Sequence, residues 1–223
     1  MAIRKHLSTL AICLLTVFAL GGLLPATALA AAPNGQVIYV GNVDVTSGGY
    51  WTTDSDGTVT AFTGEGAPTD NYIRYDTADN TLTLHNATIK ESVSSDTSTY
   101  VMGAAIGVFN QNGAAELTIQ LEGTNTIAEV SAGIYVLAFS NSTGAASLTI
   151  TSESDGSLNA SGSRNSGIWV QSNSGDATLT IKNAEVTATS EYGSGVWVQA
   201  DDGSDASLSV DAVSYTHLTL PTI

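Results

Sequence analysis

Residues 167–188, GIWVQSNSGDATLTIKNAEVTA, hold three short runs of β-strand character, at 167–171, 177–181 and 184–188. Apolar and polar side chains alternate in these runs, and residues such as Ser, Asn and Gly separate them, which is typical of short strands joined by tight turns. The same set of three runs occurs twice earlier in the chain, at 133–136, 146–150 and 156–160 and at 107–110, 115–119 and 124–127. Each repeat therefore predicts one coil with three strands.

The second run of each repeat carries a motif of the type Leu-Thr-Ile. Its leucines are separated by 35, 31, 31 and 29 residues, at Leu82, Leu117, Leu148, Leu179 and Leu208. A period of this size is typical of a solenoid, in which each repeat buries its apolar face against its neighbours. We therefore predict an all-β chain that forms a right-handed parallel β-helix, a β-solenoid of roughly 30 residues per rung.

Alternation along each strand predicts which side chains point into the coil, because successive residues of a strand face opposite ways. Leu179 and Ile181 are expected to point inward, whereas Thr178 and Thr180 point outward. Stacked coils would then form continuous apolar ladders inside and a hydroxyl-rich face outside.

The chain begins with features of a secretory signal peptide at residues 1–30. Basic residues precede an apolar run at 10–24, and the small-residue triplet Ala28-Leu29-Ala30 predicts cleavage before Ala31. The apolar run is short for a membrane span, so we expect no membrane insertion after cleavage. The chain is therefore expected to be secreted.

Residues 31–81 differ from the repeats and are expected to form a β-rich N-terminal cap, followed by parallel β-helix rungs over 82–212. A solenoid needs a cover on its first edge, because open strands invite association with other chains. Trp51, in the aromatic pair Tyr50-Trp51, is expected to plug the end of the core.

Composition narrows the range of partners. The only cysteine, Cys13, lies in the predicted signal peptide, so the secreted chain has no disulfide and depends on stacked rungs for its stability. After residue 30, four Lys and Arg stand against 21 Asp and Glu, a net charge of −17. Nucleic acid and anionic membrane surfaces are disfavoured as partners of such an acidic chain.

A family resemblance is carried by the segments VGNVDV at 40–45 and YDTADNTLTLHNATI at 75–89, together with the Gly-Ile-Tyr/Trp and Leu-Thr-Ile strands. They resemble the secreted parallel β-helix surface proteins of Gram-positive bacteria, many of which are described as containing a carbohydrate-binding domain. The resemblance covers most of residues 36–211 and implies a glycan ligand and display at the cell surface. More distantly, the chain resembles clostridial β-helix proteins that bind plant polymers with calcium.

The last eleven residues, VSYTHLTLPTI at 213–223, resemble the translated end of a sequencing adapter. We expect this tail to be non-native and the native sequence to end near Ala212. On this interpretation the later rungs, a downstream domain and any cell-surface anchor are missing from the chain.

Aromatic residues in the first strand of each repeat form the main candidate site. Aligning these strands on their Gly residues puts four aromatic residues at one register, and alternation places all four side chains outward in one ladder. Aromatic faces can pack on the C–H face of a sugar while neighbouring amides reach its hydroxyls. An aromatic stack that only stabilises the coil is the alternative. The candidate carbohydrate-binding residues are Phe109, Tyr135, Trp169, Gln171, Trp197 and Gln199.

Acidic loops form a second candidate site. Asp201, Asp202 and Asp205 are spaced around Gly203, and calcium takes six to eight oxygen ligands that include carboxylates. Calcium binding and solvated turns are the two alternatives, so calcium is the one cofactor that the sequence leaves open.

Enzymatic motifs are not apparent. His85 is the only histidine between the predicted signal peptide and the expected non-native tail, and a lone histidine is far more often structural or solvated than catalytic. Arg164 and Lys182, the bases available for a polysaccharide lyase, have no visible cluster of partners. We therefore expect a non-enzymatic, secreted or cell-surface glycan-binding β-helix. The alternatives are a structural or adhesive surface stalk and a fragment of a polysaccharide lyase.

Overall fold

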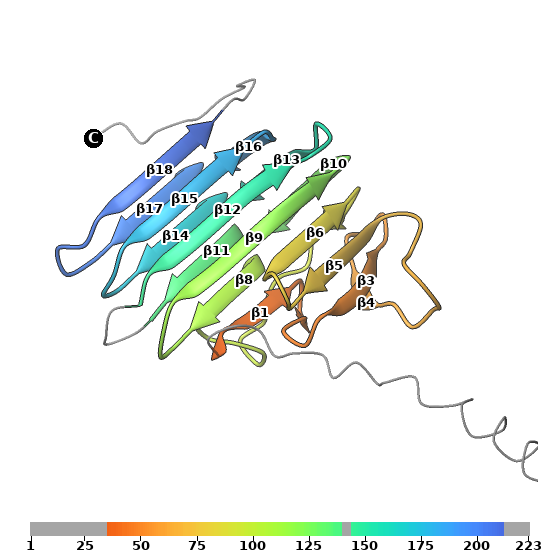
Figure 1. Ribbon diagram of the computed structural model, residues 1–223, viewed down its shortest axis with the longest axis horizontal. Helices are drawn as coiled ribbons and strands as arrows, with labels where there is room; N and C mark the ends of the chain where they lie inside the picture. The colour runs from red at the N-terminus through yellow and green to blue at the C-terminus, as the bar shows by residue number, and fades with distance from the viewer. Residues whose placement is uncertain (1–34, 140–143, 212–223) are drawn as a thin grey trace, which may run out of the picture.

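The computed structural model describes residues 35–139 and 144–211, so the expected signal peptide at 1–30 and the expected non-native tail at 213–223 lie outside the described residues. Strands are the only regular elements in this part of the chain. They form a β-solenoid of about 3 turns with successive turns ~31 residues apart (Figure 1). None of the described residues belongs to a helix that could cross a membrane.

Three sheets surround the core, and each full coil contributes one strand to each of them. Sheet A has the spatial order β17 (Val196–Ala200), β14 (Ile168–Ser172), β11 (Ala132–Ala138), β8 (Ala104–Asn110), β1 (Val37–Val40) and β2 (Val43–Asp44). Sheet B has the order β18 (Ala206–Asp211), β15 (Ala177–Lys182), β12 (Ala146–Ser152), β9 (Ala115–Glu122), β6 (Thr81–His85), β5 (Tyr72–Asp76), β3 (Gly49–Thr53) and β4 (Val59–Ala61). Sheet C has the order β16 (Glu185–Ser190), β13 (Ser157–Gly162), β10 (Thr124–Val130) and β7 (Thr88–Ile89).

The Leu-Thr-Ile strands of sheet B lie in register through the solenoid. Leu148 pairs with Leu117 on one side and with Leu179 on the other, and Leu179 pairs in turn with Leu208. The predicted β-solenoid with three strands per coil is confirmed.

The first motif is an exception, and its predicted alignment is wrong. Leu82 pairs with Ile119 rather than with Leu117, so β6 is displaced by two residues along the ladder. Leu84 then pairs with Leu121, and both Leu82 and Leu84 remain buried in the core. A shift of two residues keeps every side chain on its own face of the sheet, which is why this register forms without exposing apolar surface.

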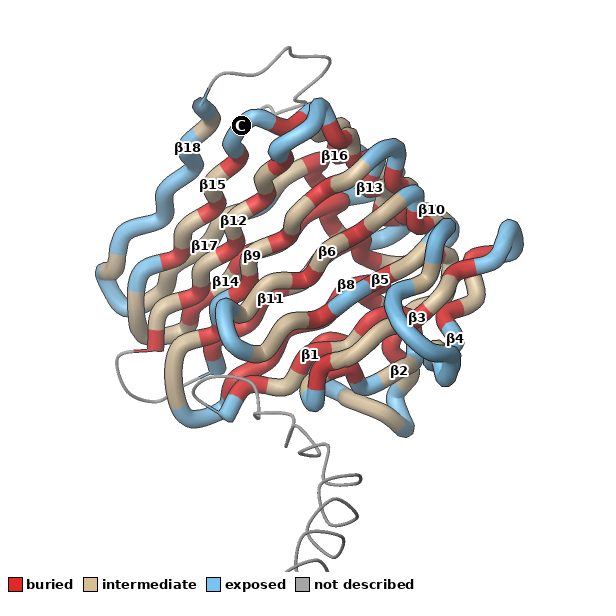
Figure 2. Tube along the Cα trace, turned by 45° about the vertical axis from the view of Figure 1, so that its right-hand side comes forward, coloured by how far each residue is buried: buried red, intermediate tan, exposed pale blue. Residues whose placement is uncertain are grey.

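Burial alternates along the strands as the sequence predicts. Leu148, Ile150 and Leu179 are completely buried, whereas the threonines between them are partly exposed (Figure 2). The last strand, β18, lacks a further neighbour among the described residues, and its Leu208 is 40% exposed although it continues the inward ladder. The inward side chains of a coil are therefore fully buried only where another coil covers them.

The N-terminal edge is closed by strands that run antiparallel to their neighbours. In sheet A, β1 pairs antiparallel with β8, and in sheet B, β5 pairs antiparallel with β6. Trp51 pairs with Ala61 and Ile73 in this region and is buried in the same core cluster as the coils, as the sequence predicts. The antiparallel strands thus cover the apolar interior at this end.

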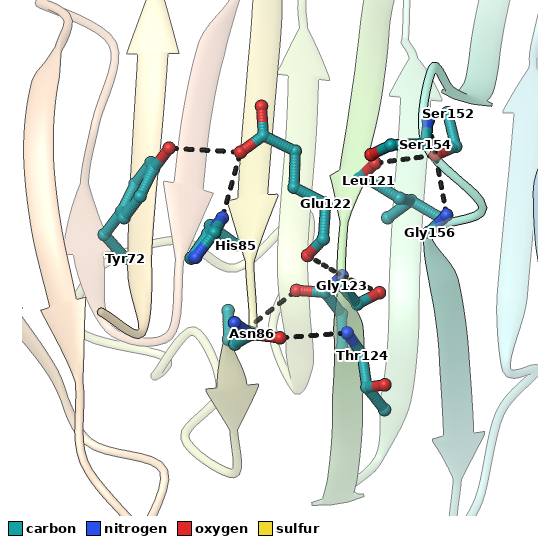
Figure 3. A network of polar contacts seen from close by, with 12 residues as sticks. Tyr72, His85, Asn86, Leu121, Glu122, Gly123, Thr124, Ser152, Ser154 and Gly156 are labelled. Atoms are coloured by element: carbon teal, nitrogen blue, oxygen red, sulfur yellow. Dashed lines mark hydrogen bonds and ion pairs between the residues drawn. The ribbon is translucent and has the colours of Figure 1, made fainter. Parts of the chain in front are cut away.

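Corners between the sheets depend on small side chains that approach the backbone of the preceding coil. At the corner between β12 and β13, Ser152 Oγ donates to the carbonyl of Leu121 (2.9 Å) and accepts from the backbone N–H of Gly156 (2.7 Å) (Figure 3). A Cβ atom on Gly156 would lie 2.4 Å from the Leu121 carbonyl oxygen. The corner therefore requires glycine at this position.

Candidate functional site

The outer face of sheet A carries the expected aromatic residues, and the pairing of its strands fixes their neighbours. Tyr135 pairs with Trp169, and Trp169 pairs with Trp197, so these three side chains follow one line across three coils. The flanking residues Ile168 and Val170 are completely buried, which leaves the aromatic residues on the outside of the coil. We call these three residues the aromatic row.

Phe109 does not belong to the aromatic row, and its predicted alignment is wrong. The residue opposite Tyr135 is Gly107, whereas Phe109 pairs with Leu137, two residues further along the strand. Phe109 is also only 8% exposed, because Tyr100 stacks on its ring with the centroids 4.1 Å apart. It cannot present an open face to a ligand.

The segment 91–103 covers the N-terminal half of this face. Val93 and Val101 from this segment pack with Phe109 and Leu137 in a second, smaller apolar cluster. Gly107 makes room for the segment, because a Cβ atom there would lie only 2.7 Å from Val101 Cγ2. Tyr135 also packs against this cluster, so the open part of the face begins at Trp169.

Within the aromatic row the first two rings are stacked. The centroids of Tyr135 and Trp169 lie 4.3 Å apart and their planes differ by 16°. Each ring thus turns one face toward the other, and the predicted flat strip of four outward faces is not what the structure contains. The arrangement of these two rings matches the stabilising stack that was the alternative.

Trp197 is oriented differently from the other two rings. Its ring centroid lies 6.5 Å from that of Trp169, at an interplanar angle of 53°. The residue is 47% exposed and, like Leu208, lies on a strand that no further coil covers among the described residues. The tilt of its ring opens a pocket of about 300 Å³ between the two coils. The pocket is lined by Arg164, Asn165, Ser166, Trp169, Gly193 and Trp197.

The two glutamines of the candidate site hold the aromatic side chains by hydrogen bonds. Tyr135 OH donates to Gln171 Oε1 (2.8 Å), and Trp197 Nε1 donates to Gln199 Oε1 (3.1 Å). Gln199 Nε2 donates in turn to Asp201 Oδ1 (3.0 Å). The glutamines therefore orient two residues of the aromatic row, Tyr135 and Trp197, a role that the sequence did not indicate.

Trp169 has a buried Nε1–H that finds no acceptor among the described residues. In the next coil, Trp197 Nε1 donates to Gln199 Oε1, two residues further along the strand. The equivalent acceptor for Trp169 would be Gln171 Oε1, but this oxygen already accepts from Tyr135 OH. A buried unsatisfied donor costs on the order of 1–3 kcal/mol.

A backbone-fixed turn of residues 164–166 forms one wall of the pocket, whose lining surface is mostly apolar. The N–H groups of Arg164 and Asn165 both donate to the carbonyl of Ser131 (3.2 and 2.8 Å), and Asn165 Nδ2 donates to Ser131 Oγ (3.2 Å). Gly193 lets the next coil approach this turn, because a Cβ atom there would lie 2.9 Å from the carbonyl carbon of Asn165. The turn is held in place while the side chain of Arg164 remains exposed.

The acidic loop that was the calcium candidate is engaged in other contacts. Asp201 accepts from Gln199, the N–H of Asp205 donates to Asp176 Oδ1 (3.0 Å), and Asp202 occupies a left-handed turn position with φ of 56°. Within the described ranges no three His, Cys, Asp or Glu side chains gather as a metal-ion group. Calcium binding by this loop stays a prediction.

A polar cluster on sheet B lies outside the pocket. Glu122 Oε2 accepts from Tyr72 OH (3.1 Å) and lies 2.9 Å from His85 Nδ1, while the Tyr72 and His85 rings stack at 4.7 Å (Figure 3). Burial, and next the neighbouring Glu122, raise the pKa of Tyr72. The three residues come from β5, β6 and β9, so the cluster links the antiparallel strands to the first parallel pair.

No protein-family model, no curated protein and no solved structure matches the chain. The geometry of the site is therefore the basis for its interpretation.

Tyr135→Phe is expected to destabilise the protein by about 1 kcal/mol at pH 8, through loss of the hydrogen bond to Gln171. Burial raises the pKa of Tyr135 to about 12. A pKa higher in the folded state than in the unfolded chain stabilises the fold below pH ~10, and this contribution is lost as the pH rises toward 12. The stability difference between wild type and variant should therefore shrink above pH 10 in urea titrations.

Tyr192→Phe is the matched control for this prediction, because Tyr192 is 78% exposed. It should follow the wild type at every pH. An unchanged difference between the wild type and Tyr135→Phe from pH 8 to pH 11 would contradict the role assigned to Tyr135.

Proposed function

We propose that the protein is a non-enzymatic glycan-binding β-solenoid whose ligand lies in the pocket between Trp169 and Trp197. The observation that carries the proposal is the tilt of the two indoles, which come from successive coils and enclose a pocket of about 300 Å³. This volume lies at the lower end of the range for small-ligand sites and suits about one sugar ring. Stacked parallel rings would leave no such space.

The lining of the pocket has the two kinds of group that sugar recognition uses. The exposed indole of Trp197 offers an apolar face to the C–H groups of a sugar. Asn165 is half-buried on a turn held by backbone hydrogen bonds, and its side-chain amide oxygen can accept from a sugar hydroxyl. Because the wall is held in place before binding, little ordering is required when a ligand enters.

Secretion and display at the cell surface are part of the same proposal. They rest on the signal-peptide pattern of residues 1–30, and the net charge of −17 for the remaining sequence suits solubility outside the cell. Polysaccharides outside the cell would then be the accessible ligands.

A structural or adhesive stalk is the second candidate. The face-to-face stack of Tyr135 on Trp169 and the cover over Phe109 favour it, since both bury aromatic surface within the protein instead of offering it to a ligand. If the protein is a stalk, we expect it to fold but to bind no glycan. The lyase alternative has a base in the pocket, Arg164, but has less support because none of the lining residues is acidic and could hold a calcium ion beside it.

Binding to a polysaccharide array tests the proposal. Trp197→Ala is expected to weaken binding at least tenfold, because it removes the exposed aromatic wall of the pocket, and truncation of a central aromatic contact commonly has an effect of this size. The matched control is Tyr100→Ala, which removes an aromatic side chain that is 40% exposed on the covered half of the same face. This control should bind as the wild type does.

Two results would contradict the proposal. One is a folded wild type that binds no polysaccharide on the array, and the other is a Trp197→Ala variant that binds as well as the wild type. Arrays with calcium and with a chelator should agree, because no carboxylate lines the pocket.

A further inference from the structure

The chain has few basic residues, and Arg164 differs from the others in its ion pairing and its position. Within residues 35–139 and 144–211, Arg74 forms an ion pair with Asp76 and Lys90 forms one with Glu129, whereas Arg164 and Lys182 have no acidic partner. Of these two unpaired bases, only Arg164 lines the pocket between the tryptophans. Arg164 is therefore an exposed base without an acidic partner among the described residues, beside a mostly apolar pocket on a strongly acidic protein.

No acidic side chain offsets this charge inside the pocket. The other lining residues are Asn165, Ser166, Gly193 and the two tryptophans. Glu191, two residues before Gly193, is exposed on the neighbouring turn and is not part of the lining. An exposed guanidinium next to an aromatic wall is available to a carboxylate, which it can bind through two parallel hydrogen bonds.

Charge also limits how many carboxylates the ligand can carry. The chain has a formal net charge of −15, so a polyanionic polysaccharide would be repelled along its length. A single carboxylate bound to Arg164 avoids this repulsion. Acidic side chains more than about 8 Å from that carboxylate are largely screened from it at physiological salt. The favoured ligand is therefore neutral except at the residue that enters the pocket.

We infer that the pocket takes one carboxylate-bearing sugar residue of an otherwise neutral glycan, with its carboxylate on Arg164 and its ring against Trp197. This inference rests on the proposed function and names the class of ligand for the same pocket. Arg164 acts as the residue that determines specificity, and Trp197 supplies affinity that is shared by neutral and acidic sugars.

Matched glycosides test the inference directly. Methyl β-glucuronide and methyl β-glucoside differ only at C6, which is a carboxylate in the first and a hydroxymethyl group in the second. The galacturonide and the galactoside form a second pair with the same difference. The readout is the set of indole N–H signals in ¹⁵N-correlation NMR spectra of the full chain, which has three tryptophans. Trp51 is buried in the cap region and serves as the internal reference.

The uronides are expected to shift the signals of Trp169 and Trp197, but not that of Trp51, and to bind about tenfold more tightly than the neutral glycosides. Arg164→Gln should abolish this preference while weak binding of the neutral glycosides remains. Lys182→Gln is the matched control, because it removes the same charge outside the pocket, and it should keep the preference.

Four outcomes would overturn the inference. Equal binding of the two members of each pair by the wild type contradicts the role of the carboxylate but leaves the glycan pocket in place. Retention of the preference in Arg164→Gln, or its loss in Lys182→Gln, contradicts the role of Arg164. If no glycoside shifts either pocket tryptophan of the folded protein, and the array also shows no binding, the proposed function fails together with the inference.

Discussion

Leu148→Ala is expected to lower the free energy of unfolding by about 3 kcal/mol, because it removes three buried carbon atoms from a coil that is covered on both sides. Leu148 is completely buried and pairs with Leu117 and Leu179 in the neighbouring coils. Each coil of a solenoid is stabilised mainly by its neighbours, so a cavity here weakens two interfaces at once. Urea titrations followed by circular dichroism measure the loss.

Thr149→Ala is the matched control for this prediction. Thr149 is adjacent in the same strand but points outward, and it is only partly buried. Its replacement should change the stability by no more than about 0.5 kcal/mol. Equal losses for the two variants would contradict the assignment of inward and outward positions.

Gly156→Ala is expected to destabilise the protein by about 3 kcal/mol, near the upper end for overpacking of a closed site. The added Cβ would lie 2.4 Å from the carbonyl oxygen of Leu121 and 2.7 Å from its carbonyl carbon. These are backbone atoms of the preceding coil, so relief requires the two coils to separate at this corner. The hydrogen bonds of Ser152 to both residues would be strained by the same movement.

Gly113→Ala provides the control for the corner. A Cβ atom there has Asn110 Nδ2 as its nearest neighbour, at 3.4 Å, and this atom belongs to a side chain at a turn. Its replacement should be tolerated within about 0.5 kcal/mol. If both glycine variants melt at the temperature of the wild type, the close approach of coils at Gly156 is not a feature of the folded protein.

Much of the solenoid could be predicted from the sequence, because two independent periods agree. Alternation within the strands separates Leu179 from Thr180, and the spacing of about 30 residues brings Leu117, Leu148 and Leu179 together. Either signal alone fits several β folds, whereas both together require stacked coils.

The register of Leu82 and of Phe109 could not be predicted in the same way. Both strands flank the segment 86–103, where the chain departs from the repeat, and in both cases the error is two residues. A slip of two residues leaves the alternation of inward and outward side chains unchanged, so the pattern does not distinguish the two alignments. The glycine at 107 was a usable signal, since it leaves a gap that another segment can fill.

The pocket itself depends on features that alternation does not describe. Alternation places Tyr135, Trp169 and Trp197 outside the coil but does not say which way their rings turn. The stack of the first two rings and the tilt of the third arise from contacts between side chains. Asn165 and Gly193 enter the pocket from two turns of successive coils, and no local motif in the sequence marks them.

The most direct test of the account is a crystal structure of the protein with an oligosaccharide from the polysaccharide that gives the strongest array signal. We predict one sugar ring against the exposed face of Trp197, within hydrogen-bonding distance of Asn165 and, where the ring carries a carboxylate, of Arg164. A ligand bound elsewhere on the solenoid, with the space between Trp169 and Trp197 empty, would contradict the central claim.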